Sequence, residues 1–385
     1  MRREKRKRIK RQSDKILGIL FIACLFIIMI LNLMTKDKKI SEEENRTLTE
    51  KPRCTWDSVL GGIYMQQYES YISDQFAGRN LWRGFSAALE RIGGSREENG
   101  VFLGKKKQLM EKIALPEEET LKKNIDSING FVKRYEDMQA RLLLIPDSAE
   151  ILKSSLPAFA STQEQSAMLD DVRDRLSKTV QWIDGSAVMS EHADEKIYYK
   201  TDHHWTSLGA YYMYLASASE LGIEKDRVNT SYHRYPVTAE FNGMLASTSG
   251  FCLSEKEEIE VYVPEEEVAV LVNYVDEQKK RTSLYDVSKL KTKDKYAVFL
   301  GGNSSVIDIK TTSESGKTLL LIKDSFANSF VPFLIPHYKE IVLVDPRYYA
   351  GTIDDIMSTY QITDTLFLYS GNTFFQDNNI SGVLE

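Results

Sequence analysis

The chain has 385 residues, of which 42% are hydrophobic and 28% are charged, and its formal net charge is −6. This composition supplies enough apolar side chains for a core and excludes wholesale disorder, while the length suits one large domain or two ordinary ones. No G-x-x-x-x-G-K-[ST] loop and no convincing G-x-G-x-x-G motif occurs, so the sequence does not indicate a nucleotide-binding site.

The N-terminus predicts a membrane anchor. Residues 1–15 carry nine Lys/Arg against two acids, and residues 16–34 contain no charged side chain. Nineteen helical residues span roughly 28 Å, close to the hydrocarbon thickness of a bilayer. Because positive charge stays inside, we expect a cytoplasmic basic tail (1–15), a single transmembrane anchor in the cell membrane (16–34) and an extracytoplasmic remainder. The alternative is a cleaved signal peptide, although the apolar run is long for one and no A-x-A-like site follows it.

The exported part is acidic. The first fifteen residues carry a net charge of +7, which leaves −13 for the rest of the chain. Binding to a phosphate backbone needs a basic surface, so we expect no nucleic-acid partner.

The three cysteines say little about whether the chain lies in an oxidising compartment. Cys24 lies in the apolar segment, which leaves Cys54 and Cys252 outside. These two could form a disulfide in an oxidising compartment, or they could remain free thiols. No C-x-x-C pair occurs, which excludes a zinc ribbon.

The segment after the anchor predicts a stalk and then helices. Residues 35–55 are polar and charged, and we expect one extracytoplasmic domain over residues 56–385. Apolar residues recur at spacings of three and four over residues 56–89, with a Gly-containing break at 74–79, and the helical pattern resumes over 81–92.

The middle of the chain mixes strand and helix signals. Residues 142–145, ended by Pro146, predict a buried strand, and residues 180–183 could be a second. Helical periodicity occurs over residues 168–176. A helix capped by Thr206 or Ser207 is expected to run to Leu221 and end at Gly222.

The C-terminal half predicts an α/β fold. Residues 226–313 contain short β-prone stretches between Ser-, Thr-, Gly- and Lys-rich segments, and we expect a small antiparallel β-rich insertion there. From Lys317, strand-like and helix-like segments alternate as TLLLI, FANSFVPFL, EIVLVD, TIDDIMSTY and TLFLYS. Such alternation predicts a parallel sheet flanked by helices.

Ser325 lies where a strand is expected to end and a helix to begin. A hydroxyl there projects beyond the carboxyl edge of the sheet, and free N–H groups of the first helical turn can stabilise an oxyanion. A serine nucleophile requires this placement. Serine is also a favoured N-cap, and this stretch alone favours the capping role.

The segment YYKTDHHWTSLG (198–209) holds two of the five histidines. In an extended segment Asp202 and His204 project to the same side, so Asp202 could orient His204 as the base for a serine. His203 would then point elsewhere, and Trp205 could wall the site and donate its indole N–H. Two other interpretations remain open: histidines packed in a core, and a metal site, for which no H-E-x-x-H or other ligand motif occurs.

The last two predicted strands are also followed by polar residues. Arg347 lies in VDPRYY and Asn372 in YSGN. Either could supply an oxyanion donor, although Pro after Asp and Gly-Asn are ordinary turn sequences.

Together these segments resemble the DHHW family of exported bacterial proteins. More distantly, they resemble the SGNH-hydrolase-like proteins that O-acetylate alginate and other exopolysaccharides. The resemblance covers essentially the whole exported chain, and the combination of TDHHWT with the later KDSF is its specific part. It rests on the blocks SEEENRTLTEKP (41–52), SDQFAGRNLW (73–82), GVFLG (100–104), LLLIPDSAEILKSSLP (142–157), YYKTDHHWTSLGAYY (198–212), FNGMLAS (241–247), LLLIKDSFANSFVPFL (319–334) and DPRYY (345–349).

The resemblance implies roles for individual residues. In the alginate-acetylating relatives a D-x-H-W block supplies acid and base and a later serine is the nucleophile, which implies Asp202, His204 and Ser325. An Asn after a later strand completes the oxyanion hole in SGNH enzymes, and Asn372 is the candidate, although the G-x-N-D block is missing and Gly371 only approximates the family's glycine.

Five further positions bear on the expected site. Asp324 replaces a small residue of the alginate proteins and could perturb the pocket. Ser148 also follows a strand, but the relatives keep no nucleophile there. We assign Arg347, Trp205 and Tyr199 to oxyanion or substrate binding.

The resemblance also implies a fold and a function. The fold is an SGNH-hydrolase-like parallel sheet flanked by helices. The function is O-acyl transfer, with acetyl as the expected group, to a cell-surface or secreted polysaccharide. A membrane-bound O-acyltransferase is expected to deliver the acyl group, and no cofactor or metal is expected. The alternatives are a carbohydrate esterase with the same triad and a non-catalytic polysaccharide-binding or assembly subunit.

Overall fold

The computed structural model describes residues 2–41, 46–228, 231–251, 253 and 256–385. The chain divides into two compact units, Met1–Gly93 and Gly94–Glu385. The predicted extracytoplasmic domain starts at residue 56, whereas the C-terminal compact unit starts at Gly94, because residues 56–93 make most of their contacts within the first unit.

The N-terminal unit is dominated by a long helix, α1 (Arg2–Met34). Within it, Ser13–Met34 is long and apolar enough to cross a membrane, a property that an anchor shares with a signal sequence. The other elements of this unit are β1 (Ile40–Ser41), β2 (Arg46–Thr47), α2 (Trp56–Leu60), α3 (Ile63–Gln75) and α4 (Arg79–Ile92). Gly78 separates α3 from α4 with a left-handed φ of 70°, a conformation that favours glycine, so the helix break predicted at 74–79 is confirmed.

The cysteine prediction stays open. Cys24 and Cys54 are free and exposed, and Cys252, the possible partner of Cys54, lies outside the described residues.

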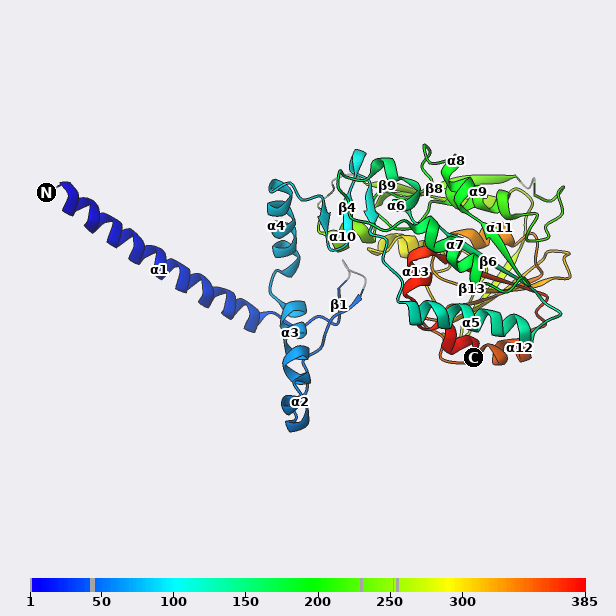
Figure 1. Ribbon diagram of the computed structural model, residues 1–385, viewed down its shortest axis with the longest axis horizontal. Helices are drawn as coiled ribbons and strands as arrows, with labels where there is room; N and C mark the ends of the chain where they lie inside the picture. The colour runs from blue at the N-terminus through cyan, green and yellow to red at the C-terminus, as the bar shows by residue number, and fades with distance from the viewer. Residues whose placement is uncertain (1, 42–45, 229–230, 252, 254–255) are drawn as a thin grey trace. The chain divides into compact units, whose positions relative to one another are not determined.

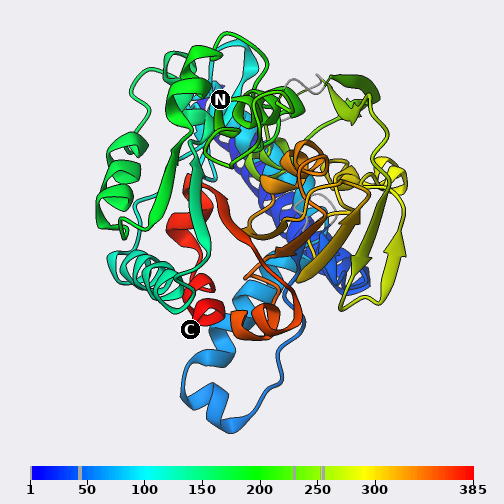
Figure 2. The ribbon, with the colours of Figure 1, turned by 90° about the vertical axis from the view of Figure 1, so that its right-hand side faces the viewer.

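An eight-stranded sheet forms the centre of the C-terminal unit (Figures 1 and 2). Its strand order is β11-β10-β12-β14-β13-β15-β6-β7, and the five strands from β14 to β7 are parallel. The predicted α/β class with a parallel sheet is therefore confirmed. The strands are β6 (Gln139–Ile145), β7 (Val180–Asp184), β10 (Val270–Tyr274), β11 (Lys279–Arg281), β12 (Val306–Thr311), β13 (Thr318–Lys323), β14 (Glu340–Val344) and β15 (Asp364–Ser370).

Alternate residues of the parallel strands face opposite layers of helices. Leu143 and Leu321 pack with α9 (Ser207–Ser217) and α11 (Ala327–Leu334) on one face. Leu142 and Leu320 pack on the other face with α5 (Glu118–Arg134), α7 (Gln165–Arg175), α12 (Ile353–Thr359), α13 (Gly371–Gln376) and α14 (Ile380–Leu384). This is why the strands read as continuous apolar runs: both faces of the sheet are buried.

The segment 226–313 differs from the predicted insertion. Its antiparallel strands exist, but β10, β11 and β12 continue the central sheet, because β12 pairs with β14. Only β8 (Tyr232–Phe241) and β9 (Glu257–Pro264) form a separate two-stranded sheet within the described part of this segment. The remaining elements are β3 (Glu97–Glu98), β4 (Val101–Leu103), β5 (Leu109–Glu111), α6 (Ser148–Ile151), α8 (Ser186–Glu191) and α10 (Met244–Ser249).

A buried ion pair links the carboxyl ends of β13 and β14. The Nζ atom of Lys323 lies 3.3 Å from Oδ2 of Asp345, and both side chains are fully buried. Lys323 also donates to Oδ1 of Asn328 at 3.0 Å, and Asp345 accepts two hydrogen bonds from the guanidinium of Arg347. Burial lowers the pKa of Lys323, although Asp345 opposes this shift. The pair therefore depends on both of its members.

Replacing Asp345 by Ala should destabilise the fold strongly. The variant would leave the Lys323 ammonium buried without its counter-charge, which costs about 3–5 kcal/mol of unfolding free energy. Urea denaturation of the detergent-solubilised chain, followed by tryptophan fluorescence, measures this. Glu119→Ala, which removes an exposed partner of Lys123, should leave the midpoint unchanged. Equal midpoints for the two variants would contradict the structural role of Asp345.

Candidate active site

A chain of hydrogen bonds joins three of the residues expected from the sequence. Nδ1 of His204 lies 2.5 Å from Oδ1 of Asp202, and Nε2 of His204 lies 2.8 Å from Oγ of Ser325. With the proton on Nδ1, the imidazole donates to the carboxylate and its Nε2 accepts from the serine hydroxyl. This is the order of contacts by which a carboxylate orients a base toward a nucleophile.

Asp202 is held from two directions. Its buried carboxylate also accepts the backbone N–H of His204 at 3.0 Å and that of Met244 at 2.8 Å. The Met244 contact requires close approach of the preceding residue, since a Cβ on Gly243 would lie 2.3 Å from Cβ of Asp202. Burial alone would oppose ionisation, but His204, His203 and these hydrogen bonds lower the pKa of Asp202, so its carboxylate is charged.

A second buried carboxylate fixes the segment just before Asp202. Glu257, at the start of β9, accepts the backbone N–H of Lys200 at 2.9 Å and that of Thr201 at 2.8 Å. The Thr201 hydroxyl donates to the same carboxylate at 2.7 Å. The 198–205 segment is thus clamped to β9, and a bridge between Tyr198 and Trp205 closes it.

The pKa values of the two neighbouring histidines are shifted in opposite directions. Burial and the positive His203 lower the pKa of His204 to about 4, so His204 is neutral near pH 7. Burial would also lower the pKa of His203, but the carboxylates of Asp202, Glu111 and Asp147 outweigh it and raise that pKa. Tyr296 covers His204 with a nearly parallel ring, the centroids 3.8 Å apart. His204 is therefore the neutral imidazole of the pair and His203 the one that holds a proton more readily.

Asp324 orders the turn that carries Ser325. Its buried carboxylate accepts the backbone N–H of Phe326 at 2.9 Å and that of Ser370, at the end of β15, at 2.9 Å. The side chain thus links the carboxyl ends of β13 and β15. It occupies the interior of the turn, which differs from the expected perturbation of a pocket.

The side chains of Trp205 and Tyr199 are buried in the core and do not line the cavity. Trp205 is fully buried, stacks on Phe330 and donates its indole N–H to the carbonyl of Phe326 at 3.0 Å. Tyr199 is also buried and packs edge-to-face against Phe241 and Tyr296. The expected indole hydrogen bond exists, but neither ring has an exposed face for a substrate, because each fills the core behind the site.

Asn372 and Arg347 lie on a cavity next to His203. The side-chain amide of Asn372 donates to the carbonyl of Lys112 at 3.1 Å and accepts from the N–H of Ala114 at 3.3 Å. Arg347 binds Asp345 with two parallel hydrogen bonds of 2.8 and 2.7 Å. The structure brings both residues to the same edge of the sheet as Ser325, with part of their hydrogen-bonding capacity used by the protein.

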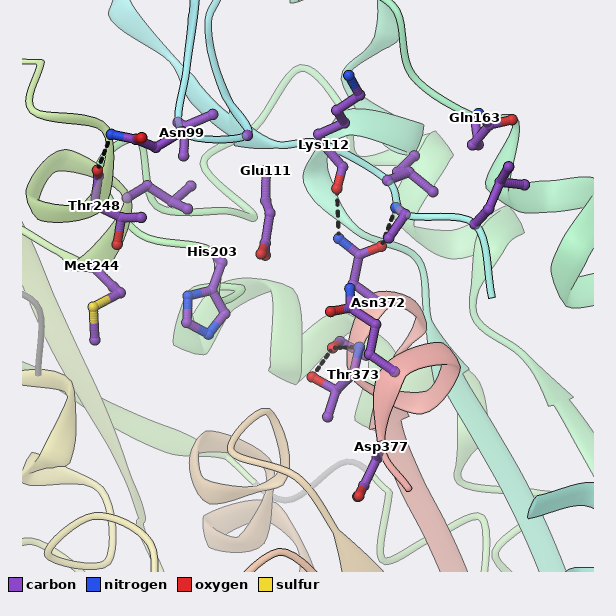
Figure 3. A pocket seen from close by; sticks show the side chains of 18 of the residues that line it. Asn99, Glu111, Lys112, Gln163, His203, Met244, Thr248, Asn372, Thr373 and Asp377 are labelled. Atoms are coloured by element: carbon purple, nitrogen blue, oxygen red, sulfur yellow. Dashed lines mark hydrogen bonds between the residues drawn. The ribbon is translucent and has the colours of Figure 1, made fainter. Parts of the chain in front are cut away.

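The cavity itself is rich in carboxamides. It has a volume of about 710 Å³, within the range of roughly 300–1,000 Å³ that is usual for small-ligand sites. Figure 3 shows His203, Glu111 and Asn372 around it. Carboxamide groups both donate and accept hydrogen bonds, which suits a ligand with many hydroxyls. Those that line the cavity are Asn99, Gln163, Asn372, Gln376, Asn378 and Asn379.

Residues that the sequence did not single out complete the site. Tyr296 and Gly243 are two of these, and Asp147, at the end of β6, is a third. Asp147 accepts the backbone N–H of Asn372 at 2.8 Å and the side chain of Gln165 at 2.5 Å, and burial raises its pKa to about 7. Gly243 lies in the block FNGMLAS (241–247), and Asp147 lies in the block LLLIPDSAEILKSSLP (142–157). The family resemblance, which rests on these blocks, could therefore have pointed to both residues. Tyr296 has no such signal.

Asp202, His203 and His204 could also hold a metal ion by proximity. One possible ligand atom from each lies within 4.8 Å of the others. Both ring nitrogens of His204, however, already have partners in Asp202 and Ser325. A metal ion bound by His204 would displace one of these contacts, so the metal interpretation and the serine–histidine interpretation exclude each other.

Comparison with known proteins identifies the family. The model of the DHHW protein family matches residues 143–344, which include Asp202, His204 and Ser325. Among curated proteins, none matches the chain.

Solved structures share the fold. A DHHW family protein from Eubacterium siraeum is 21% identical, with a TM-score of 0.62, over 74% of this chain and 95% of that one. Bacillus cereus PatB1 is 21% identical, with a TM-score of 0.60, over 72% of this chain and 98% of that one, and a second PatB1 structure carries a sulfonyl adduct. The O-acetyltransferase domain of Pseudomonas putida AlgJ is more distant, with 14% identity and a TM-score of 0.47 over 74% of this chain and 95% of that one. Because the family match spans just over half of the sequence, the chain belongs to the DHHW protein family.

Proposed function

We propose that the chain is a membrane-anchored, extracytoplasmic O-acyltransferase, with acetyl as the transferred group and a cell-surface or secreted polysaccharide as the acceptor. The observation that carries the proposal is the hydrogen-bonded order Ser325–His204–Asp202 at the carboxyl edge of a parallel sheet. Such an arrangement activates a hydroxyl for attack on an ester or thioester carbonyl.

In the first half-reaction Ser325 takes the acyl group. Oγ attacks the carbonyl carbon of the donor, His204 Nε2 accepts the hydroxyl proton, and the donor's leaving group departs with that proton. The charged Asp202 holds the imidazole in the required tautomer and stabilises the imidazolium. Asn372 and Arg347 are the proposed oxyanion donors, because Asn372 has a second amide N–H besides the one bonded to Lys112, and Arg347 has N–H groups beyond the two bonded to Asp345.

In the second half-reaction a sugar hydroxyl takes the acyl group from Ser325. Neutral His204 accepts the proton of the sugar hydroxyl, the sugar oxygen attacks the acyl-serine ester, and the serine hydroxyl re-forms. We place the acceptor in the cavity beside His203, whose carboxamide lining suits sugar hydroxyls. Water in place of the sugar would make the same residues an esterase.

The acyl donor must reach an extracytoplasmic site. The family resemblance supports a membrane-bound O-acyltransferase as the partner that delivers it, and α1 would keep Ser325 on a chain tethered to the same membrane. Residues 1–15, with nine basic side chains, favour a cytoplasmic N-terminus.

A sulfonyl fluoride should label Ser325 and nothing else of comparable reactivity. The activated Oγ displaces fluoride, which intact-mass and peptide mass spectrometry of the full chain in detergent can detect. Ser325→Ala should abolish the label and lower hydrolysis of an aryl acetate by roughly 10⁴-fold or more. Ser148→Ala, the same change after the parallel strand β6, is the matched control and should behave as wild type.

Three outcomes separate the candidate functions. Full activity and glycan acetylation in Ser325→Ala would refute catalysis by this serine. A glycan phenotype from deletion of the chain but not from Ser325→Ala would favour a binding subunit. Aryl acetate hydrolysis without any transfer to an oligosaccharide would favour an esterase.

His203→Gln should change the pH profile and leave activity at pH 8 nearly intact. Wild-type activity needs neutral His204 and should fall only as the pH approaches about 4. Removing the positive His203 raises the pKa of His204, so the acid limb should move to higher pH. A loss of activity at every pH, together with loss of wild-type activity on chelation, would support the metal interpretation. His204→Ala should remove activity at all pH values.

Gly243→Ala should impair catalysis by displacing Asp202. The new Cβ would lie 2.4 Å from Oδ2 of Asp202, so the carboxylate must shift and His204 loses its orientation. A misplacement of about 1 Å can cost roughly a hundredfold in rate, which we expect in kcat rather than KM. Gly382→Ala, where the added Cβ has no neighbour within 4 Å, is the control. An unchanged kcat in Gly243→Ala would argue against a role for Asp202.

A further inference from the structure

Helix α4 of the N-terminal unit has an exposed apolar face. Residues 81, 85, 89 and 92 follow one another at intervals of four, four and three, which places them on one side of the helix, and residue 82 borders them. The opposite side carries polar and charged side chains, among them Arg83 and Glu90. The exposed fractions on the apolar face run from 45% to 84%, and its members are Leu81, Trp82, Phe85, Leu89 and Ile92.

The length and the two faces of α4 limit what can cover it. A contiguous group of large exposed apolar side chains marks a surface that binds a protein or a membrane. The helix has 14 residues and is therefore about 21 Å long, whereas a bilayer's hydrocarbon core is about 30 Å thick. With a charged side as well, α4 cannot cross a bilayer, but it has the form of a helix that lies along a membrane surface.

A hydrogen bond ties the start of α4 to the end of the apolar part of α1. The side-chain oxygen of Asn32 accepts the backbone N–H of Ala77 at 2.9 Å, and α4 begins two residues later, at Arg79. Asn32 lies in the last turn of α1, whose apolar segment ends at Met34. If this segment spans the membrane, the first residue of α4 lies at the level where the segment leaves it.

A second set of contacts holds the end of α3 at the same place. The hydroxyl of Tyr71 donates to the carboxylate of Asp37 at 3.0 Å. The side-chain amide of Gln75 accepts the backbone N–H of Lys38 and donates to its carbonyl, both at 2.9 Å. Residues 37 and 38 follow α1 closely, so the position of the α3–α4 junction beside the end of α1 does not depend on Asn32 alone.

We propose that the apolar face of α4 binds the extracytoplasmic surface of the lipid bilayer that α1 crosses. Its aliphatic side chains and Phe85 would enter the boundary between headgroups and acyl chains, and the polar side of the helix would face water. Trp82 would lie at that boundary, where indole rings are enriched. The proposal rests on the proposed membrane anchor and its orientation, and it does not require acyl transfer.

A helix bound in this way would also restrain the rest of the chain. α4 ends at Ile92, and the C-terminal unit begins at Gly94. The start of the unit that carries Ser325 would therefore be tied to the membrane surface, which is where the proposed acyl donor is delivered.

Quenching of tryptophan fluorescence by brominated lipid tests the proposal in the full chain. The chain is reconstituted into phosphatidylcholine vesicles whose acyl chains carry bromine near the headgroup end, or no bromine. Bromine quenches an indole only at close contact, so wild-type emission should be lower in the brominated vesicles. Trp82→Phe keeps the face apolar and should remove that difference. Trp182→Phe, in β7 of the other unit, should retain it.

Flotation of the vesicles on a density gradient tests the anchor separately. If the chain floats but wild type and Trp82→Phe are quenched equally, the proposal is wrong and the anchor stands. Loss of quenching in Trp56→Phe instead would assign the lipid contact to α2 and also overturn it. A blue-shifted Trp82 emission that bromine does not quench would place the face against protein. A chain that does not float would overturn both the anchor and the proposal, and none of these results depends on the reactivity of Ser325.

Discussion

Buried carboxylates hold the candidate active site together, because a carboxylate away from water needs hydrogen-bond donors from the protein. Asp202, Asp324 and Glu257 each meet this demand with backbone N–H groups from elsewhere in the chain: Met244, Ser370 and Thr201, respectively. Each carboxylate therefore joins two segments that are distant in sequence. The contact between His204 and Ser325, two residues separated by 121 positions, depends on these links.

Burial and nearby charges give the two adjacent histidines different properties. Asp202 holds His204 by its Nδ1, and Tyr296 covers the ring, so His204 has one orientation and one useful nitrogen. His203 lines the cavity, and the carboxylates of Asp202, Glu111 and Asp147 together outweigh burial and raise its pKa. Burial and the charge of His203 outweigh the effect of Asp202 on His204, whereas three carboxylates outweigh burial at His203, so the two adjacent residues differ in the direction of their pKa shifts.

Much of this arrangement could be predicted from the sequence. The alternation after Lys317 predicted the parallel strands and α11 nearly to the residue. The resemblance to the DHHW family and its relatives predicted that Asp202, His204 and Ser325 would come together. Local patterns carry such information because they reflect the period of each element and the chemistry of its ends. The break between α3 and α4 at Gly78 was also predictable, because a left-handed backbone conformation favours glycine.

Other features could not be predicted, for physical reasons. Short antiparallel strands look alike whether they extend a sheet or form a separate one, so β10–β12 could not be assigned to the central sheet. The indole of Trp205 has a polar N–H that suggests a ligand contact, but only the fold reveals Phe326 as its partner. Tyr296 stacks on His204, and Gly243 closely approaches Asp202. Both contacts join residues distant in the chain, so no periodic pattern in the sequence indicates them.

The placement of β15 also sets when the site can form. It is the last strand of the chain, yet it lies in the middle of the sheet, between β13 and β6. Asp324 needs the N–H of Ser370 at the end of β15, so the turn around Ser325 is complete only after the C-terminal residues have joined the sheet. A chain cut short before residue 364 carries the serine without these surroundings. The surroundings of this hydroxyl are thereby complete only when the C-terminal end of the chain has folded.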